Sequence, residues 1–139
     1  MPVSFRILPG RNLVYVRYDG IAGVAETESS FRSYAAHPDF RPGQMQLIDV
    51  SRVTGYEKAY AEFIAMQARI AGMAYRPDRS IFIAFYATTA VGREMAGLAG
   101  ASWDSVDGAV VVMGEDEGEL LALLGLRERS FADLLASAD

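Results

Sequence analysis

The stretch from Gln46 to Glu57 constrains the fold of this chain most, because it joins an almost continuous apolar run to a turn and a helix start. Residues 46–50 read Gln-Leu-Ile-Asp-Val, a pattern typical of a strand that is covered on both faces. Thr54 and Glu57 have the spacing of a helix capping box, so we expect a helix over residues 55–74. A two-sided strand followed by a long helix predicts one βα unit of a parallel sheet.

The rest of the chain repeats this alternation of strand and helix. Two short β-prone runs, residues 5–8 and 13–18, flank turn-forming residues and predict an antiparallel hairpin. The remaining elements are expected as a helix at 24–36, strands at 80–87 and 109–113, a helix at 90–101, and helical segments around residues 120–124 and 131–135. This order predicts a single α/β domain, residues 1–139, whose mixed sheet has an N-terminal antiparallel hairpin followed by parallel βαβ units.

The periodicity within these elements indicates which side chains meet the core. In the second strand, one face is expected to carry Val14, Val16 and Tyr18, and the other Tyr15, Arg17 and Asp19. The long helix has an apolar stripe made of Tyr60, Phe63, Ile64, Gln67, Ile70 and Ala71, which would form core or the floor of a pocket for an apolar ligand. A second line in that helix, Ala59, Met66 and Met73, would widen the core face or meet another subunit.

The helix expected at 90–101 contains three glycines, so it is either weak or packed very close to a neighbour. Thr88 or Thr89 can cap its N-terminus.

Composition excludes several kinds of chemistry. The 139 residues include no cysteine, which rules out disulfides, thiolate metal sites and cysteine nucleophiles. The net charge is −5 and no basic stripe is visible, so we expect no nucleic-acid partner. No apolar run is long enough to span a bilayer and no signal peptide is visible, so we expect a cytoplasmic protein. No phosphate-binding glycine motif or metal-binding spacing is present, and we expect no cofactor and no metal.

Three segments together resemble a known group of domains: the strand at residues 47–51, the turn Gly55-Tyr56 into a long helix, and the strand at 110–112 before a leucine-rich helix. Over about residues 5–125 the chain resembles the SpoIIAA-like domains, which are related to STAS domains and to the lipid-binding Sec14-type fold. The resemblance implies a mixed sheet with helices mostly on one side. It implies roles in protein–protein regulation or in binding small or apolar ligands.

The chain departs from this pattern at one turn. STAS regulators present a phosphorylatable serine in an Asp-Ser-Ser-Gly or similar turn, whereas here the turn is shortened to Arg52-Val53-Thr54-Gly55. Thr54, and less well Ser51, occupy the analogous place. A phosphoswitch of the sigma-factor type is therefore not predicted.

The expected site lies beyond the carboxyl ends of the parallel strands, where open α/β sheets bind ligands. The ligand or regulatory candidates there are Asp49, Ser51, Thr54, Tyr56, Tyr86, Thr88 and Glu115. Asp49 would act as an acid or base, or would hold the following turn by accepting backbone hydrogen bonds. Ser51 and Thr54 would bind an anion at a helix start, or Thr54 would only cap the helix. The only histidine, His37, precedes Pro38 and is expected to cap a helix end.

These residues favour a non-enzymatic regulatory or protein-interaction domain, because the set contains no histidine, cysteine or lysine. The alternative is binding or carriage of a small, apolar ligand at the strand carboxyl ends. An enzyme using Asp49 and Glu115 as acid and base is the third reading, and no catalytic residue is assigned. The partners left open are a second copy of the chain, another protein and a small apolar ligand.

Overall fold

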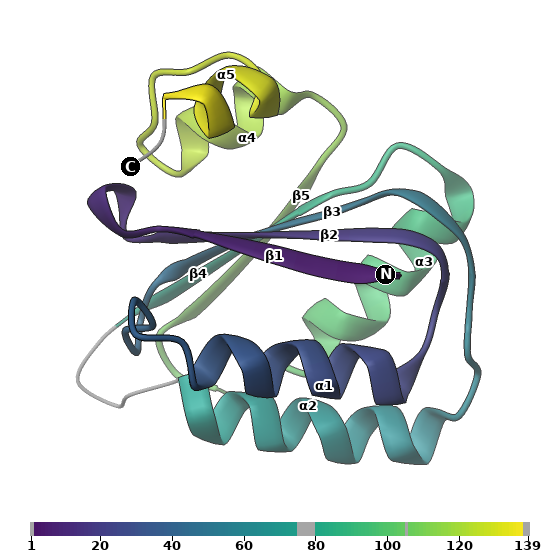
Figure 1. The fold of residues 1–139 in the computed structure, drawn as a ribbon. Coiled ribbons are helices and arrows are strands. Elements are labelled where there is room, and N and C mark those ends of the chain that lie inside the picture. The colour runs from purple at the N-terminus through teal and green to yellow at the C-terminus, as the bar shows by residue number, and fades with distance from the viewer. Residues whose placement is uncertain (1, 75–79, 105, 138–139) are drawn as a thin grey trace.

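The computed structural model describes residues 2–74, 80–104 and 106–137 as an α/β fold built on one five-stranded sheet (Figure 1). The strands are β1 (Val3–Leu8), β2 (Leu13–Ala22), β3 (Met45–Tyr56), β4 (Ile81–Tyr86) and β5 (Ala109–Gly114). The helices are α1 (Val24–Ala35), α2 (Tyr60–Ala74), α3 (Ala90–Ala101), α4 (Glu117–Leu123) and α5 (Phe131–Ala136), with a short 3-10 turn at Pro9–Arg11.

The strands lie in the order in which they occur along the chain. β1 pairs with β2 antiparallel, and β2–β3, β3–β4 and β4–β5 are parallel. The predicted α/β fold, with a mixed sheet and an N-terminal hairpin, is confirmed. Figure 1 shows α1, α2 and α3 on one face of the sheet and the short α4 and α5 on the other. We call these the three-helix face and the two-helix face.

The alternation predicted for β2 is confirmed. Val16 and Tyr18 pack into the core of the three-helix face, and Tyr15 packs into the core of the two-helix face. In β3 the same alternation places Val50 and Ile48 on the three-helix face and Leu47 on the other.

The predicted capping box at Thr54 and Glu57 is wrong, because β3 continues through both the expected turn and the expected helix start. β2 is long enough to pair with β3 as far as Ala22 opposite Tyr56, with register shifts that each let β3 carry one extra residue. Thr54 is therefore an exposed strand residue. Glu57 caps a different helix: its Oε1 accepts a hydrogen bond from the Val24 backbone N–H at the start of α1, 3.0 Å away.

The apolar stripe predicted for α2 is wrong in part. Met66 and Ile70 are buried and Phe63 is half-buried, whereas Ile64 is 64% exposed. Helix α2 begins at Tyr60, so the face that meets the sheet runs through Phe63, Met66 and Ile70. Met66 is thus a core residue, and not a contact for another subunit. The side chains of Tyr60 and Met73 lie outside the described part of the chain.

Helix α3 starts as predicted, and its close packing explains why two of its three glycine positions have no room for a larger residue. The Thr89 side chain accepts from the Gly92 backbone N–H at 3.0 Å, which confirms one of the two expected caps. A Cβ at Gly92 would lie 3.0 Å from the Val50 carbonyl oxygen, and one at Gly100 would lie 3.1 Å from Val111 Cγ1. The helix is therefore pressed against β3 and β5, which was one of the two alternatives.

Candidate functional site

Asp49 and Ser51, two of the expected site residues, form a closed hydrogen-bond group on the two-helix face. Asp49 is only 6% exposed. Its Oδ2 accepts from the Tyr15 hydroxyl at 2.9 Å, and its Oδ1 accepts from both the backbone N–H of Ser51 (2.9 Å) and the Ser51 hydroxyl (2.6 Å). Burial, with the Asp49 charge next, raises the pKa of Tyr15 well above its usual value. Both carboxylate oxygens are thus engaged with neighbours, which agrees with the structural alternative for Asp49.

Tyr86 lies beside this group and completes an aromatic cover. It is the register partner of Asp49 across β3 and β4. The Phe131 ring of α5 packs edge-on against Tyr86 (centroids 4.9 Å apart) and tilted against Tyr15 (5.6 Å). Partial burial, and then the charges of Glu117 and Asp49, raise the pKa of Tyr86. α5 therefore closes this face over its polar groups.

The other predicted site residues do not join Asp49. Thr54 and Thr88 are exposed. Tyr56 packs against the core of the three-helix face, and its hydroxyl donates to Glu94 Oε1. Glu115 is exposed and lies 4.0 Å from Arg93 of α3 in an ion pair. The seven predicted residues are thus divided between the two faces and the surface, and they do not form one site.

A cavity lies on the three-helix face, between the sheet and its helices. Its volume is about 90 Å³, several times the roughly 10–15 Å³ that one water molecule needs. Its walls are mostly apolar side chains, among them Val16, Ile48, Phe85, Phe31, Phe63 and Met66. The cavity extends to Ala22 and Tyr56, the last residues of β2 and β3, so one end reaches the strand carboxyl ends where a ligand was expected.

Gln46 is the unusual polar side chain in this wall. It is 7% exposed, and its Nε2 is buried with no hydrogen-bond partner; it is the single buried side-chain nitrogen or oxygen of this kind among the described residues. Gln46 stands between Val14 of β2 and Ile83 of β4 in register, and all three line the cavity. A buried donor without a partner typically costs about 1–3 kcal/mol.

The other polar groups of the wall are satisfied or lie at its margin. Tyr18 is fully enclosed, which raises the pKa of its hydroxyl, and a hydrogen bond with the Thr27 side chain lowers it less. Gln67 Oε1 accepts from the Ser102 hydroxyl at 3.3 Å. Glu57 is the one carboxylate among the described lining residues, which include no lysine, arginine or histidine, and it is exposed. The enclosed part of the cavity is therefore uncharged.

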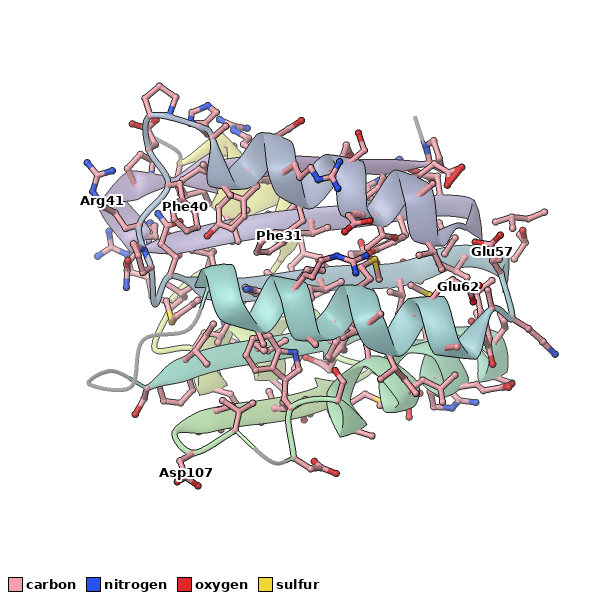
Figure 2. All side chains as sticks on the ribbon, turned by 90° about the horizontal axis from the view of Figure 1, so that it is seen from below. Phe31, Phe40, Arg41, Glu57, Glu62 and Asp107 are labelled. Atoms are coloured by element: carbon pink, nitrogen blue, oxygen red, sulfur yellow. The ribbon has the colours of Figure 1, made fainter. Side chains whose placement is uncertain are left out.

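The two ends of the cavity differ. Figure 2 shows Phe40 and Glu57 at opposite ends of the parallel pair α1 and α2, with Phe31 in the space between the two helices. At the Phe40 end, the Tyr34 ring meets Phe40 (centroids 4.9 Å) and its hydroxyl donates to Gln44 Oε1 at 2.6 Å. This end is closed by aromatic packing, whereas the Glu57 end is bordered by exposed polar groups.

An ion pair links α1 and α2 across the seam between them. Arg69 Nε of α2 donates to Glu28 Oε2 of α1 at 2.5 Å. The hydrogen bond from Arg69 holds the pKa of Glu28 below its usual value. Both side chains are in contact with solvent, so this ion pair stabilises the contact between α1 and α2 only weakly.

Sequence reasoning missed Gln46 and Tyr18 as site residues. Gln46 had a usable signal: it is a polar residue in the same apolar run as Asp49. Because buried polar groups need partners, Gln46 could have been recognised as a candidate site residue in the same way as Asp49. The absence of a partner for Gln46 depends on the packing of α1 and α2, which the local sequence does not specify.

The described part of the chain has no group of three or more histidine, cysteine, aspartate or glutamate residues placed to hold a metal ion. None of its described helices combines the length and apolar character needed to cross a bilayer.

Comparison with known proteins bears on the fold. No protein-family model matches this sequence, and no curated protein matches it. Among solved structures, the fold matches an uncharacterized protein from Shewanella loihica PV-4, of the DUF3478 family and with a SpoIIAA-like fold. The TM-score is 0.59, the sequences are 14% identical, and the alignment covers 88% of this chain and 93% of that chain. The predicted SpoIIAA-like fold is confirmed, and a similarity at this identity shows the fold alone.

Proposed function

We propose that this protein binds a small, largely apolar molecule in the cavity of the three-helix face. The observation that carries the proposal is the coincidence of an apolar void and the buried, unpartnered Nε2 of Gln46 in one wall. The proposal keeps the ligand-binding alternative drawn from the sequence and moves its site from Asp49 and Ser51 to the other face.

The energetics support a ligand in this place. Protein cores pack as densely as organic crystals, so an empty space of about 90 Å³ forfeits dispersion contacts that a ligand would restore. An apolar cavity of about 150 Å³ in another protein stays dry and binds benzene, so a somewhat smaller molecule suits this one.

The proposal is tested first by native mass spectrometry of the purified protein, before and after denaturation. A small molecule released on denaturation is the expected result, and its mass identifies the compound to study.

A matched pair of variants then locates the site. Val16→Phe places a ring in the cavity, and Val112→Phe makes the same change in β5 on the two-helix face. Binding of cyclopentane or xenon, followed by NMR, should be abolished by Val16→Phe and kept by Val112→Phe. Equal binding by both variants, or no binding to the wild-type protein, would contradict the proposal.

A second candidate function, self-association, corresponds to the interaction role favoured by the sequence. Phe82 and Val110 are register partners on β4 and β5, and each is 40% exposed. Met113 of β5 is 44% exposed. Val110 and Met113 lie on opposite faces of the edge strand β5, so the edge is apolar on both sides and would suit a second copy of the chain. Sedimentation velocity should then show a dimer that Val110→Lys dissociates, and a wild-type monomer at high concentration would exclude it.

A further inference from the structure

We infer that the ligand of this cavity is an electrically neutral molecule with a hydrogen-bond acceptor, such as a ketone, aldehyde or ester carbonyl, and that Gln46 Nε2 donates to that acceptor. The inference rests on the proposed function and deepens it, because it names the chemical class that the cavity selects.

The donor is Gln46 Nε2, which the fold holds in place. Gln46 is held in the middle of the sheet by β3, with β2 on one side and β4 on the other, so its backbone cannot move to find a partner. Its Nε2 is enclosed, and the side chains of its register partners, Val14 and Ile83, offer no acceptor. A carbonyl oxygen on a bound molecule supplies the missing acceptor, whereas a pure hydrocarbon leaves the N–H groups unsatisfied.

The wall of the cavity also limits the charge of the ligand. An ionised group is stable inside an apolar cavity only when an opposite charge is paired with it. The described lining residues include no cationic side chain, so a carboxylate or phosphate would have no partner. The lone carboxylate, Glu57, is exposed at one end and is already engaged with the Val24 N–H. The enclosed part of the ligand is therefore neutral.

The position of Gln46 along the cavity gives the ligand an orientation. Gln46 is opposite Val14, and Tyr18 lies four residues further along β2, about 13 Å away at the usual strand rise. The cavity continues past Tyr18 to Ala22 and Gly23. The acceptor of the ligand thus lies against Gln46, and its small apolar part lies on the side of the acceptor that faces Tyr18.

The test uses three small ring probes that differ in one group: cyclopentanone, cyclopentane and cyclopentanecarboxylate. The wild-type protein should bind cyclopentanone about tenfold more tightly than cyclopentane, which is the effect expected of one buried hydrogen bond. It should bind cyclopentanecarboxylate more weakly than either at neutral pH. Affinities are measured by NMR titration on the full chain.

The matched variant is Gln46→Met, which keeps an unbranched side chain and removes the donor. It should bind cyclopentane as well as the wild type does and lose the preference for cyclopentanone. Equal affinities of the wild type for ketone and hydrocarbon, a ketone preference that survives in Gln46→Met, or tightest binding of the carboxylate would each overturn the inference while leaving the proposed function intact. If the wild-type protein binds none of the probes, the proposed function fails and the inference fails with it.

A second measurement on the wild-type protein covers the case in which Gln46→Met does not fold. The side-chain amide signal of Gln46 should move on saturation with cyclopentanone and stay in place on saturation with cyclopentane. The same response to both probes would overturn the inference.

Discussion

Two buried polar residues of β3, one on each face of the sheet, differ in whether their hydrogen-bonding groups have partners. On the two-helix face, Asp49 engages Tyr15 and Ser51 with both of its oxygens, and Phe131 packs over the aromatic rings beside it. On the three-helix face, Gln46 leaves a donor unpaired beside an apolar void. The same strand, β3, carries both residues. A buried polar residue without hydrogen-bond partners is thus a candidate for binding a ligand, whereas one with its partners present has a structural role.

The largest expected effect comes from removing the satisfied group. Asp49→Ala leaves the Tyr15 hydroxyl and the Ser51 N–H without their acceptor, and should lower the free energy of unfolding by about 3–5 kcal/mol. Tyr15→Phe, which loses one hydrogen bond, should cost about 1–2 kcal/mol. Urea denaturation measures both. A small effect of Asp49→Ala would mean that the two-helix face is not the tightly satisfied one.

The next largest effect is the loss of stability when neighbouring residues of β3, one on each face, are shortened to alanine. Leu47 is fully buried on the two-helix face, whereas Ile48 lines the cavity. Leu47→Ala should cost about 4 kcal/mol, because it opens a new void in a closed core. Ile48→Ala should cost about 2 kcal/mol, because it enlarges a void that already exists, and should admit larger apolar probes. Equal losses of stability in denaturant titrations would remove the distinction in packing.

A smaller effect, of opposite sign, is expected at Gln46. Gln46→Met removes an unpaired buried donor and should raise the free energy of unfolding of the ligand-free protein by about 1 kcal/mol. Thermal and urea denaturation of protein freed of ligand provide the measurement. A loss of stability instead would show that Gln46 has a structural partner.

The smallest effect concerns the seam over the cavity. Arg69 lowers the pKa of Glu28, so the pair is intact above the usual carboxyl value of 4.5 and is lost as the pH falls through the lowered folded pKa. Wild-type protein should therefore release a bound probe a few-fold faster in acid than at neutral pH. Glu28→Gln should release it at the faster rate throughout, as followed by NMR exchange. Matching rates for the two proteins at neutral pH would show that the seam does not limit exit.

The sequence predicted the architecture because its signals are local. Alternation in β2, the apolar run of β3 and the cap at Thr89 each depend on a few neighbouring residues, and each was confirmed. The capping box predicted at Thr54 and Glu57 does not form, because strand pairing is more favourable there than a helix start. β3 pairs with β2 as far as Tyr56, and this tertiary contact outweighs the local helix signal. The alternation of polar Arg52, apolar Val53 and polar Thr54 was the signal in the sequence for a continued strand.

The candidate site was much less predictable. Asp49, Ser51 and Tyr86 were expected together and do lie together, but the hydrogen bonds that occupy Asp49 involve Tyr15, which lies 34 residues away. The cavity depends on how α1 and α2 settle on the sheet, and on side chains as distant in sequence as Val14 and Trp103. No periodicity in the sequence encodes a gap of that kind, because it is the space left when distant elements meet.

The sequential strand order has a consequence for the growing chain during synthesis. Each new strand is laid against the one made before it, so the sheet can assemble as the chain leaves the ribosome. The helices of the three-helix face are synthesised by Ala101, whereas Leu13 and Tyr15 in β2 wait for Phe131 and Leu134 of α5 to cover them. The three-helix face is thus synthesised before the two-helix face is complete. Residues made more than a hundred positions later therefore shield the apolar surface of one of the first strands.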